Sequence, residues 1–174
     1  MRSTAQLSRR GRSRKERGAT MIEAALVMVF LFALIFLLID LAWAVFAKVT
    51  LQNAVRAGVR YAVTSQTGTD PNTGLALGQV ASIKQVVQTQ AMGLLTDSDM
   101  SNDVFINFYA VGSNPPAALT GVGSNAGGNL VTVSVQGYQL SPIAPLLRPA
   151  SPVTISVSAG DLLEASPITG APPL

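Results

Sequence analysis

The stretch Gly18–Ala47, GATMIEAALVMVFLFALIFLLIDLAWAVFA, decides the fold of this chain. Its residues 24–39 carry no charge, and Glu23 and Asp40 bracket that run. As a helix rising about 1.5 Å per residue, Met21 to Ala47 covers roughly 40 Å, whereas the hydrocarbon core of a bilayer is about 30 Å thick. No Pro or Gly follows the first residue, so the helix can satisfy its backbone hydrogen bonds internally, as lipid demands. The sequence therefore predicts a transmembrane helix over residues 19–47.

The composition excludes several kinds of chemistry. The chain has 174 residues with no Cys and no His, which removes disulfides, thiolate nucleophiles, histidine acid–base catalysis and the usual zinc ligand sets. Only 12% of the residues are charged, against about 25% in typical soluble proteins. The length leaves room for one modest domain besides the helix.

Charge is distributed unevenly about the apolar stretch. Residues 1–17 hold seven basic side chains and one acidic, a net of +6, and the rest holds five basic and eight acidic, a net of −3. Because basic flanks stay in the cytoplasm, this asymmetry predicts a cytoplasmic N-terminus and an exported C-terminal part. A basic tail can also bind nucleic acid. This tail has no aromatic residue for base stacking and adjoins a span, so we expect no nucleic-acid partner.

Three kinds of processing fit the N-terminal region. The triplet Ala-Trp-Ala at 42–44 has the A-x-A pattern of a signal-peptide cleavage site, which would release a soluble domain starting at Val45. The apolar core is longer than in such peptides, however, and Asp40 and Trp43 stand where small neutral residues are expected. An uncleaved signal anchor is the second alternative. The third is cleavage after Gly18, which would leave the apolar segment on the mature protein.

Two motifs bear on the third alternative. In RGATMIE, residues 17–23, Gly18 follows a basic leader and Glu23 stands at the fifth position after it. This spacing resembles the signal of type IV pilins and pseudopilins, which prepilin peptidase cuts after the Gly. Residues 51–62 are LQNAVRAGVRYA. With the R-G-A start and the acidic Asp40, this segment resembles the N-terminal region of TadE-like proteins of the tight-adherence (Tad/Flp) pilus system.

The resemblance implies a pseudopilin or minor pilin, a non-catalytic component in the assembly of a Tad pilus. Prepilin peptidase would cut between Gly18 and Ala19, and Glu23 would face the new α-amine of Ala19 on a neighbouring subunit. A carboxylate at mid-bilayer costs up to about 3 kcal/mol, less near the edge, so such residues tend to be functional. The alternative for Glu23 is an interfacial side chain that snorkels to the head groups.

The implied partners are inner-membrane lipid, prepilin peptidase, other pilin-like subunits and the Tad secretion machinery. The implied location is the bacterial inner membrane, as a single-pass protein that enters a pilus or stays in the assembly machine. TadF-like and TadG-like proteins share the leading segment and stay open as identities. The alternative function is a signal-anchored envelope protein whose exported domain binds a partner or ligand.

Beyond the span, residues 48–64 are expected to prolong the helix into water. Apolar side chains recur there in 3- and 4-residue steps: Val45, Val49, Val55, Val59, Ala62 and Val63. Arg56 and Arg60 share another face, which we expect to be solvated; the alternative is pairing with acidic groups of the exported domain or of a neighbouring subunit. Residues 65–78 predict a loop, and residues 79–95 a second helix. Its apolar stripe indicates core packing: Val80, Ile83, Val87, Ala91 and Leu94.

Strands are predicted in the rest of the chain, after a helix-ending turn at 97–99. Alternating apolar residues mark the three candidate strands: 103–111, 130–136 and 153–158. Residues 112–128 predict a long loop, prolines exclude a regular element over 137–152, and the tail 166–174 is expected to be disordered. The fold class is therefore α+β: a basic leader 1–18, the extended transmembrane helix, and an exported domain 65–165 with one helix and an antiparallel sheet of about three strands.

Other candidate sites fail on their spacing. Asp97, Asp99, Ser101 and Asp103 match positions 1, 3, 5 and 7 of a calcium loop, but the Gly and the bidentate Glu of that loop are replaced by Asn102 and Phe108. The Gly pairs between residues 121 and 128 lack the spacing and the Lys of a phosphate loop. No Ser lies in a nucleophile motif. We therefore expect no metal, no cofactor and no enzymatic activity.

Overall fold

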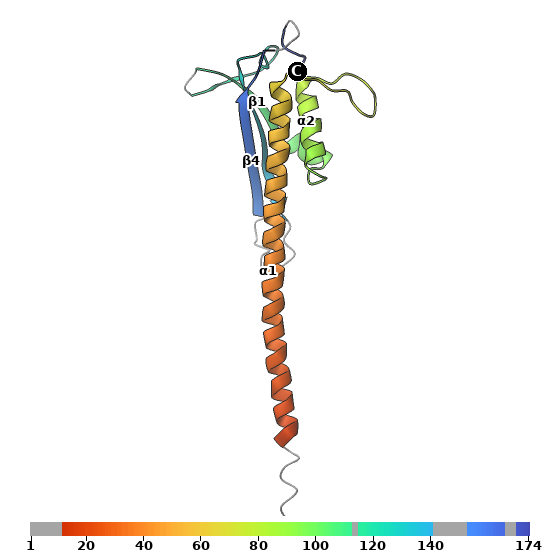
Figure 1. Cartoon of the computed structure of the whole chain (residues 1–174), viewed down its shortest axis with the longest axis vertical. Helices are drawn as coiled ribbons and strands as arrows, with labels where there is room; N and C mark the ends of the chain where they lie inside the picture. The colour runs from red at the N-terminus through yellow and green to blue at the C-terminus, as the bar shows by residue number, and fades with distance from the viewer. Residues whose placement is uncertain (1–11, 113–114, 141–152, 166–169) are drawn as a thin grey trace, which may run out of the picture. The chain divides into compact units, whose positions relative to one another are not determined.

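The computed structural model describes residues 12–112, 115–140, 153–165 and 170–174, with the backbone alone for 12–17. The elements follow in the order α1 (Arg12–Val63), α2 (Gln79–Gln90), α3 (Asp97–Asn102), β1 (Val104–Ala110), β2 (Ala117–Leu119), β3 (Leu130–Leu140) and β4 (Val153–Leu162) (Figure 1). Of the described residues, 12–42 belong to one compact unit and those from 43 onward to a second. Most of the leader, most of the Pro-rich segment and residues 166–169 of the tail lie outside the described residues.

Helix α1 is continuous and begins at Arg12, six residues before Gly18. The helix therefore includes residues 12–17 of the basic leader. Arg, Lys and Glu are good helix formers, so a charged composition does not by itself prevent a helix. The C-terminal end of α1 at Val63 agrees with the predicted extension over 48–64.

The N-terminal unit contains the apolar part of α1. Its large apolar side chains from Met21 to Ile39 are between 40% and 76% exposed. Within the described residues, α1 is the one helix long and apolar enough to cross a membrane. A helix that is apolar on all sides needs an apolar environment, so these side chains must be covered by lipid or by other helices.

The second unit is built on a four-stranded antiparallel sheet with strand order β2-β1-β3-β4. The central pair β1 and β3 aligns Val104 with Val135 and Phe108 with Val131. Strand β4 then pairs along β3, with an irregularity between Val135 and Tyr138. The expectation of an antiparallel sheet is confirmed, and the sheet has one strand more than expected.

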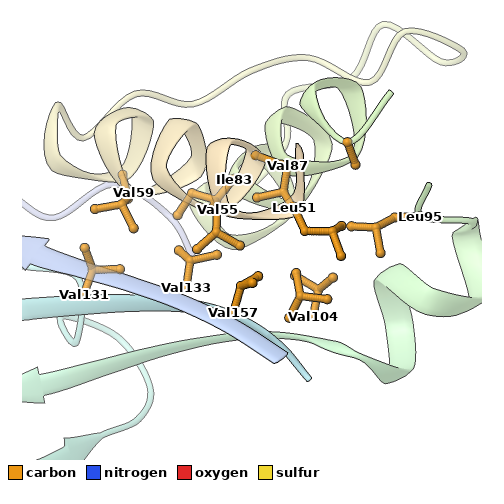
Figure 2. Close-up of a cluster of buried hydrophobic side chains, with 14 of the residues drawn as sticks. Leu51, Val55, Val59, Ile83, Val87, Leu95, Val104, Val131, Val133 and Val157 are labelled. Atoms are coloured by element: carbon orange, nitrogen blue, oxygen red, sulfur yellow. The ribbon is translucent and has the colours of Figure 1, made fainter. Parts of the chain in front are cut away.

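One face of the sheet is covered by the C-terminal part of α1 and by α2 (Figure 2). Leu51, Val55 and Val59 of α1 are buried against the alternate valines of β3, which are fully buried. Ile83 and Val87 complete the layer from α2, as the predicted stripe required. The predicted apolar face of α1 was partly wrong, because Val45 and Val49 are exposed. Small and branched residues at 51, 54, 55, 59 and 62 form the buried face instead.

The shorter elements depart from the predicted bounds. Helix α2 ends at Gln90, not at 95, because Met92 and Gly93 adopt positive φ. The predicted turn at 97–99 is instead the start of α3, where Thr96 and Asp99 form a capping box. Strand β2 lies inside the predicted loop 112–128, and β3 and β4 each continue four residues beyond their predicted ends.

The last residues also differ from the expectation of a disordered tail. The carbonyl of Pro173 accepts a hydrogen bond from the backbone N–H of Gln79 (2.7 Å), and the carbonyl of Pro172 accepts one from Asn125 Nδ2 (2.8 Å). Helix α2 has Gly78 at its N-cap and therefore lacks a side-chain cap. The Pro173 carbonyl satisfies one of the N–H groups that such an end leaves without partners.

Gly58 allows α1 and α2 to approach closely. A Cβ at this position would lie 2.6 Å from Cγ2 of Val87 and 3.4 Å from Cγ2 of Ile83. We expect Gly58→Ala to lower the free energy of unfolding by about 1 kcal/mol, because overpacking of about 1–3 kcal/mol exceeds the helix-propensity gain of about 1 kcal/mol. Near-UV circular dichroism of the full chain in detergent, followed against denaturant, measures this change.

A double variant provides the control for this packing argument. Val87→Ala removes the methyl group that the new Cβ would meet, so Gly58→Ala should be nearly neutral or stabilising in that background. Equal costs of Gly58→Ala in both backgrounds would contradict the role of Gly58 as a packing contact.

Candidate functional site

Gly18, Ala19 and Glu23, the predicted cleavage and assembly residues, lie together in the first half of α1. All three are exposed, and a Cβ built on Gly18 would meet no atom within 4 Å. Ala19 and Glu23 are four residues apart, so they lie on one face of the helix, one turn from each other. The structure therefore places the carboxylate and the predicted new α-amine on the same side of the helix.

The predicted scissile bond lies inside helix α1, because the helix begins before Gly18. A helical bond is held by hydrogen bonds on both sides, so cutting it requires local opening. Glycine costs about 1 kcal/mol in a helix interior relative to alanine, which lowers the cost of opening at this point.

From Gly18 onward, Asp40 is the first buried residue of α1, with 8% of its surface exposed. Nearby, the rings of Trp43 and Phe46 stack with centroids 5.5 Å apart, and Trp43 keeps 44% of its surface exposed. An amphipathic Trp at this position is typical of a residue at the membrane interface.

Arg56 and Arg60 lie on the exposed side of α1 in the second unit. They line a hollow of about 560 Å³ together with Asn53, Tyr61 and Thr64 of the α1 end, Gln66 of the following loop and Val86 of α2. Among the described residues, no acidic side chain pairs with either guanidinium. The described part of the chain therefore shows no ion pair between these arginines and an acidic side chain of the exported domain.

The acidic residues near α3 do not form a calcium loop. The Asp99 carboxylate accepts hydrogen bonds from Thr96 N and Thr96 Oγ1, and Asp97 Oδ1 accepts one from Gln88 Nε2 at 2.6 Å. These carboxylates thus cap a helix and bind an amide. In the described ranges, no three His, Cys, Asp or Glu side chains come close enough to hold a metal ion.

A second hollow, of about 430 Å³, lies beside α3 and is lined by Asp99, Asp103 and Tyr138. Burial raises the pKa of the Tyr138 hydroxyl, and the negative charge of Asp99 raises this pKa further. No basic side chain lines this hollow among the described residues, so its electrostatic character is negative.

A buried polar cluster holds the end of the domain together and was not predicted. Gln79 and Asn125 are both fully buried, and Asn125 Nδ2 donates to Gln79 Oε1 at 2.7 Å. Gln79 Nε2 donates to the Ala62 carbonyl at the end of α1, 3.0 Å away. Gln79 lies outside the predicted apolar stripe of its helix and Asn125 lies in a Gly-rich stretch, so nothing in the local pattern indicates their burial.

The comparisons with known proteins give one match. The model of the TadE-like protein family matches residues 18–60, which begin at Gly18 and end at Arg60. No curated protein and no solved structure matches the chain. The match covers the apolar part of α1 and most of its extension and indicates a component associated with the Tad pilus. Over the helix from Gly18 to Arg60, about a quarter of the chain, this protein is therefore similar to TadE-like proteins.

Proposed function

We propose that the protein is a pseudopilin or minor pilin of a Tad pilus, a non-catalytic subunit that takes part in assembly through its N-terminal helix. The observation that carries this proposal is the coincidence of two features in α1. The family match begins at Gly18, and the apolar side chains that follow are left exposed by the rest of the chain. A helix of this kind is suited to packing in lipid and against other pilin-like helices.

In this proposal the chain is anchored in the inner membrane with its N-terminus in the cytoplasm. Prepilin peptidase cuts between Gly18 and Ala19 and removes the basic leader. The mature helix then starts with the α-amine of Ala19, one turn before the Glu23 carboxylate. An ammonium and a carboxylate in a region of low dielectric relieve each other's desolvation, so Glu23 of one subunit pairs with Ala19 of its neighbour.

The mature N-terminus tests the processing step. Intact mass and N-terminal peptide sequencing of membrane-purified protein should give a start at Ala19 when prepilin peptidase is active. The same protein from cells without the peptidase, or with Gly18→Leu, should keep its leader. Ala33→Leu, farther along the same helix, is a matched control and should be cut normally.

Two other results would overturn the processing step. An intact N-terminus in all backgrounds would leave a signal-anchored envelope protein with an exported binding domain. A start at Val45 would mean that the helix is an export signal and the domain is soluble.

A further inference from the structure

The hollow around Arg56 and Arg60, defined here as the arginine groove, holds two like charges four residues apart on α1. Like charges in this arrangement repel and destabilise a helix slightly. In the described part of the chain neither guanidinium has an acidic partner, although Asn53, Thr64 and Gln66 supply further polar groups around them. A concave surface with two guanidinium groups suits carboxylates, which guanidinium binds in a planar, two-hydrogen-bond geometry.

The same domain carries a group of carboxylates on and beside α3 that pairs with no cation among the described residues. Helix α3 and its C-cap contribute Asp97, Asp99 and Asp103 within seven residues, and Asp97 is exposed. Lys84 of α2 contacts α3, but its Nζ donates to the backbone carbonyl of Met100 at 2.7 Å. Among the described residues, the three carboxylates have no ion-pair partner.

The arginine groove and α3 lie on different sides of α2. Val86 of α2 lines the groove, whereas Lys84 of α2 contacts α3. Lys84 and Val86 are two positions apart, so they lie about 200° apart around the helix axis, because each turn takes 3.6 residues. The two charged surfaces are therefore directed apart within one molecule, and complementary pairing requires two molecules.

We propose that the arginine groove of one copy of this chain binds the α3 carboxylates of a second copy. The contact joins two different surfaces, so it is heterologous and leaves one groove and one group of α3 carboxylates open at the ends of each pair. Repetition of the contact produces an open row of subunits. This inference deepens the assembly role proposed above and rests on it, but it does not require cleavage at Gly18.

Cysteine cross-linking of the full chain in isolated membranes tests this contact without background, because the chain has no Cys of its own. Thr64→Cys lies in the groove and Ser98→Cys lies in α3, and both positions are exposed. These changes leave all the arginines and aspartates in place. Two differently tagged copies, one with each cysteine, should form a mixed disulfide dimer on oxidation.

Charge reversal then tests the cause of the contact. Arg56→Glu with Arg60→Glu in the first copy should lower the yield at least about tenfold, because like charges across an interface are strongly unfavourable. Asp97→Lys with Asp103→Lys in the second copy should do the same, and the two reversed copies together should recover the cross-link. Asp99 stays unchanged because it caps α3. Asp161→Lys with Glu164→Lys reverses two exposed carboxylates elsewhere and should have no effect.

Four results would overturn the inference. A yield that does not respond to charge reversal would mean that the contact is not electrostatic. Predominant pairing of Thr64→Cys with itself would indicate a symmetric interface instead. If maleimide labelling of the Thr64→Cys variant falls as the anionic lipid content of the membrane rises, the groove binds lipid head groups instead. A mature start at Ala19 without the mixed cross-link would remove this interface and leave the proposed function intact.

Discussion

Replacing Glu23 with alanine is expected to abolish assembly while leaving the N-terminus cut at Ala19. Glu23 is exposed on α1, inside the part of the helix whose other side chains are apolar. The alanine variant is more apolar and should insert in the membrane at least as well. It removes the carboxylate that we assign to the neighbouring α-amine, and truncating one partner of a desolvated charge pair costs about 2–5 kcal/mol.

That cost corresponds to a loss of at least about tenfold in the amount of assembled protein. The measurement is the fraction of the chain that elutes with other pilin-like subunits after mild detergent extraction, together with its intact mass. Glu23→Gln, which keeps the shape and removes the charge, should behave like Glu23→Ala. Glu23→Asp, which keeps the charge, should recover part of the assembly.

Met21→Ala is the matched control, because Met21 is also exposed in the first turns of the span and carries no charge. Its assembled fraction should stay near that of the wild type. Normal assembly of Glu23→Ala would assign Glu23 to the head-group interface and withdraw its role in subunit pairing. Loss of both cleavage and assembly would instead make Glu23 part of the peptidase signal.

The sequence predicts the large elements of this protein because each is long and strongly patterned. The uninterrupted apolar run gave α1, and the 3- and 4-residue spacing of Ile83 and Val87 gave the buried face of α2. The alternation in Val131, Val133 and Val135 gave the central strand, whose valines are all buried. In α2 and the central strand, the apolar side chains whose spacing predicts the element also form the core.

Elements that depend on a few local hydrogen bonds were not predicted correctly. Asp97 and Asp99 are typical of turns, and their position after a helix predicted an ending. The decisive feature was Thr96 three residues before Asp99, a capping box that starts a new helix. Strand β2 has three residues in a stretch rich in Gly, Asn and Pro, so its pairing with β1 has no signal in the local sequence.

Partners that lie far apart in the sequence were also beyond prediction. The family motif located Gly18 and Glu23 because it is a short local pattern. By contrast, Gln79 and Asn125 are joined across 46 positions, and Asn125 and Pro172 across 47. Only the folded chain brings such groups together, because Asn and Gln side chains are usually exposed.

Gln79→Leu is expected to lower the free energy of unfolding of the exported domain by about 2–3 kcal/mol. The variant keeps an apolar side chain of similar length at a fully buried position and removes both side-chain hydrogen bonds of Gln79. Asn125 Nδ2 then keeps only the Pro172 carbonyl, and the Ala62 carbonyl keeps only the N–H of Ser65. Buried polar groups that lose a partner cost about 1–3 kcal/mol each.

The measurements are the denaturant midpoint of the full chain in detergent and hydrogen exchange along the backbone. Exchange should increase at the N-terminal end of α2 and in residues 121–129, which the Gln79–Asn125 bond connects. Gln90→Leu is the matched control, because Gln90 is in the same helix but exposed. Its free energy of unfolding should change by less than about 0.5 kcal/mol.

A double-mutant cycle with Asn125→Leu separates the polar cluster from simple packing effects. Asn125 Oδ1 is buried without a hydrogen-bond partner in the described structure, so replacing both amides removes an unsatisfied group as well as the pair. The double variant should therefore cost less than the sum of the single variants, by about 1 kcal/mol. Additive costs would contradict the cluster, because they would mean that Gln79 and Asn125 stabilise the domain independently and that the bond between them does not connect α2 to the loop.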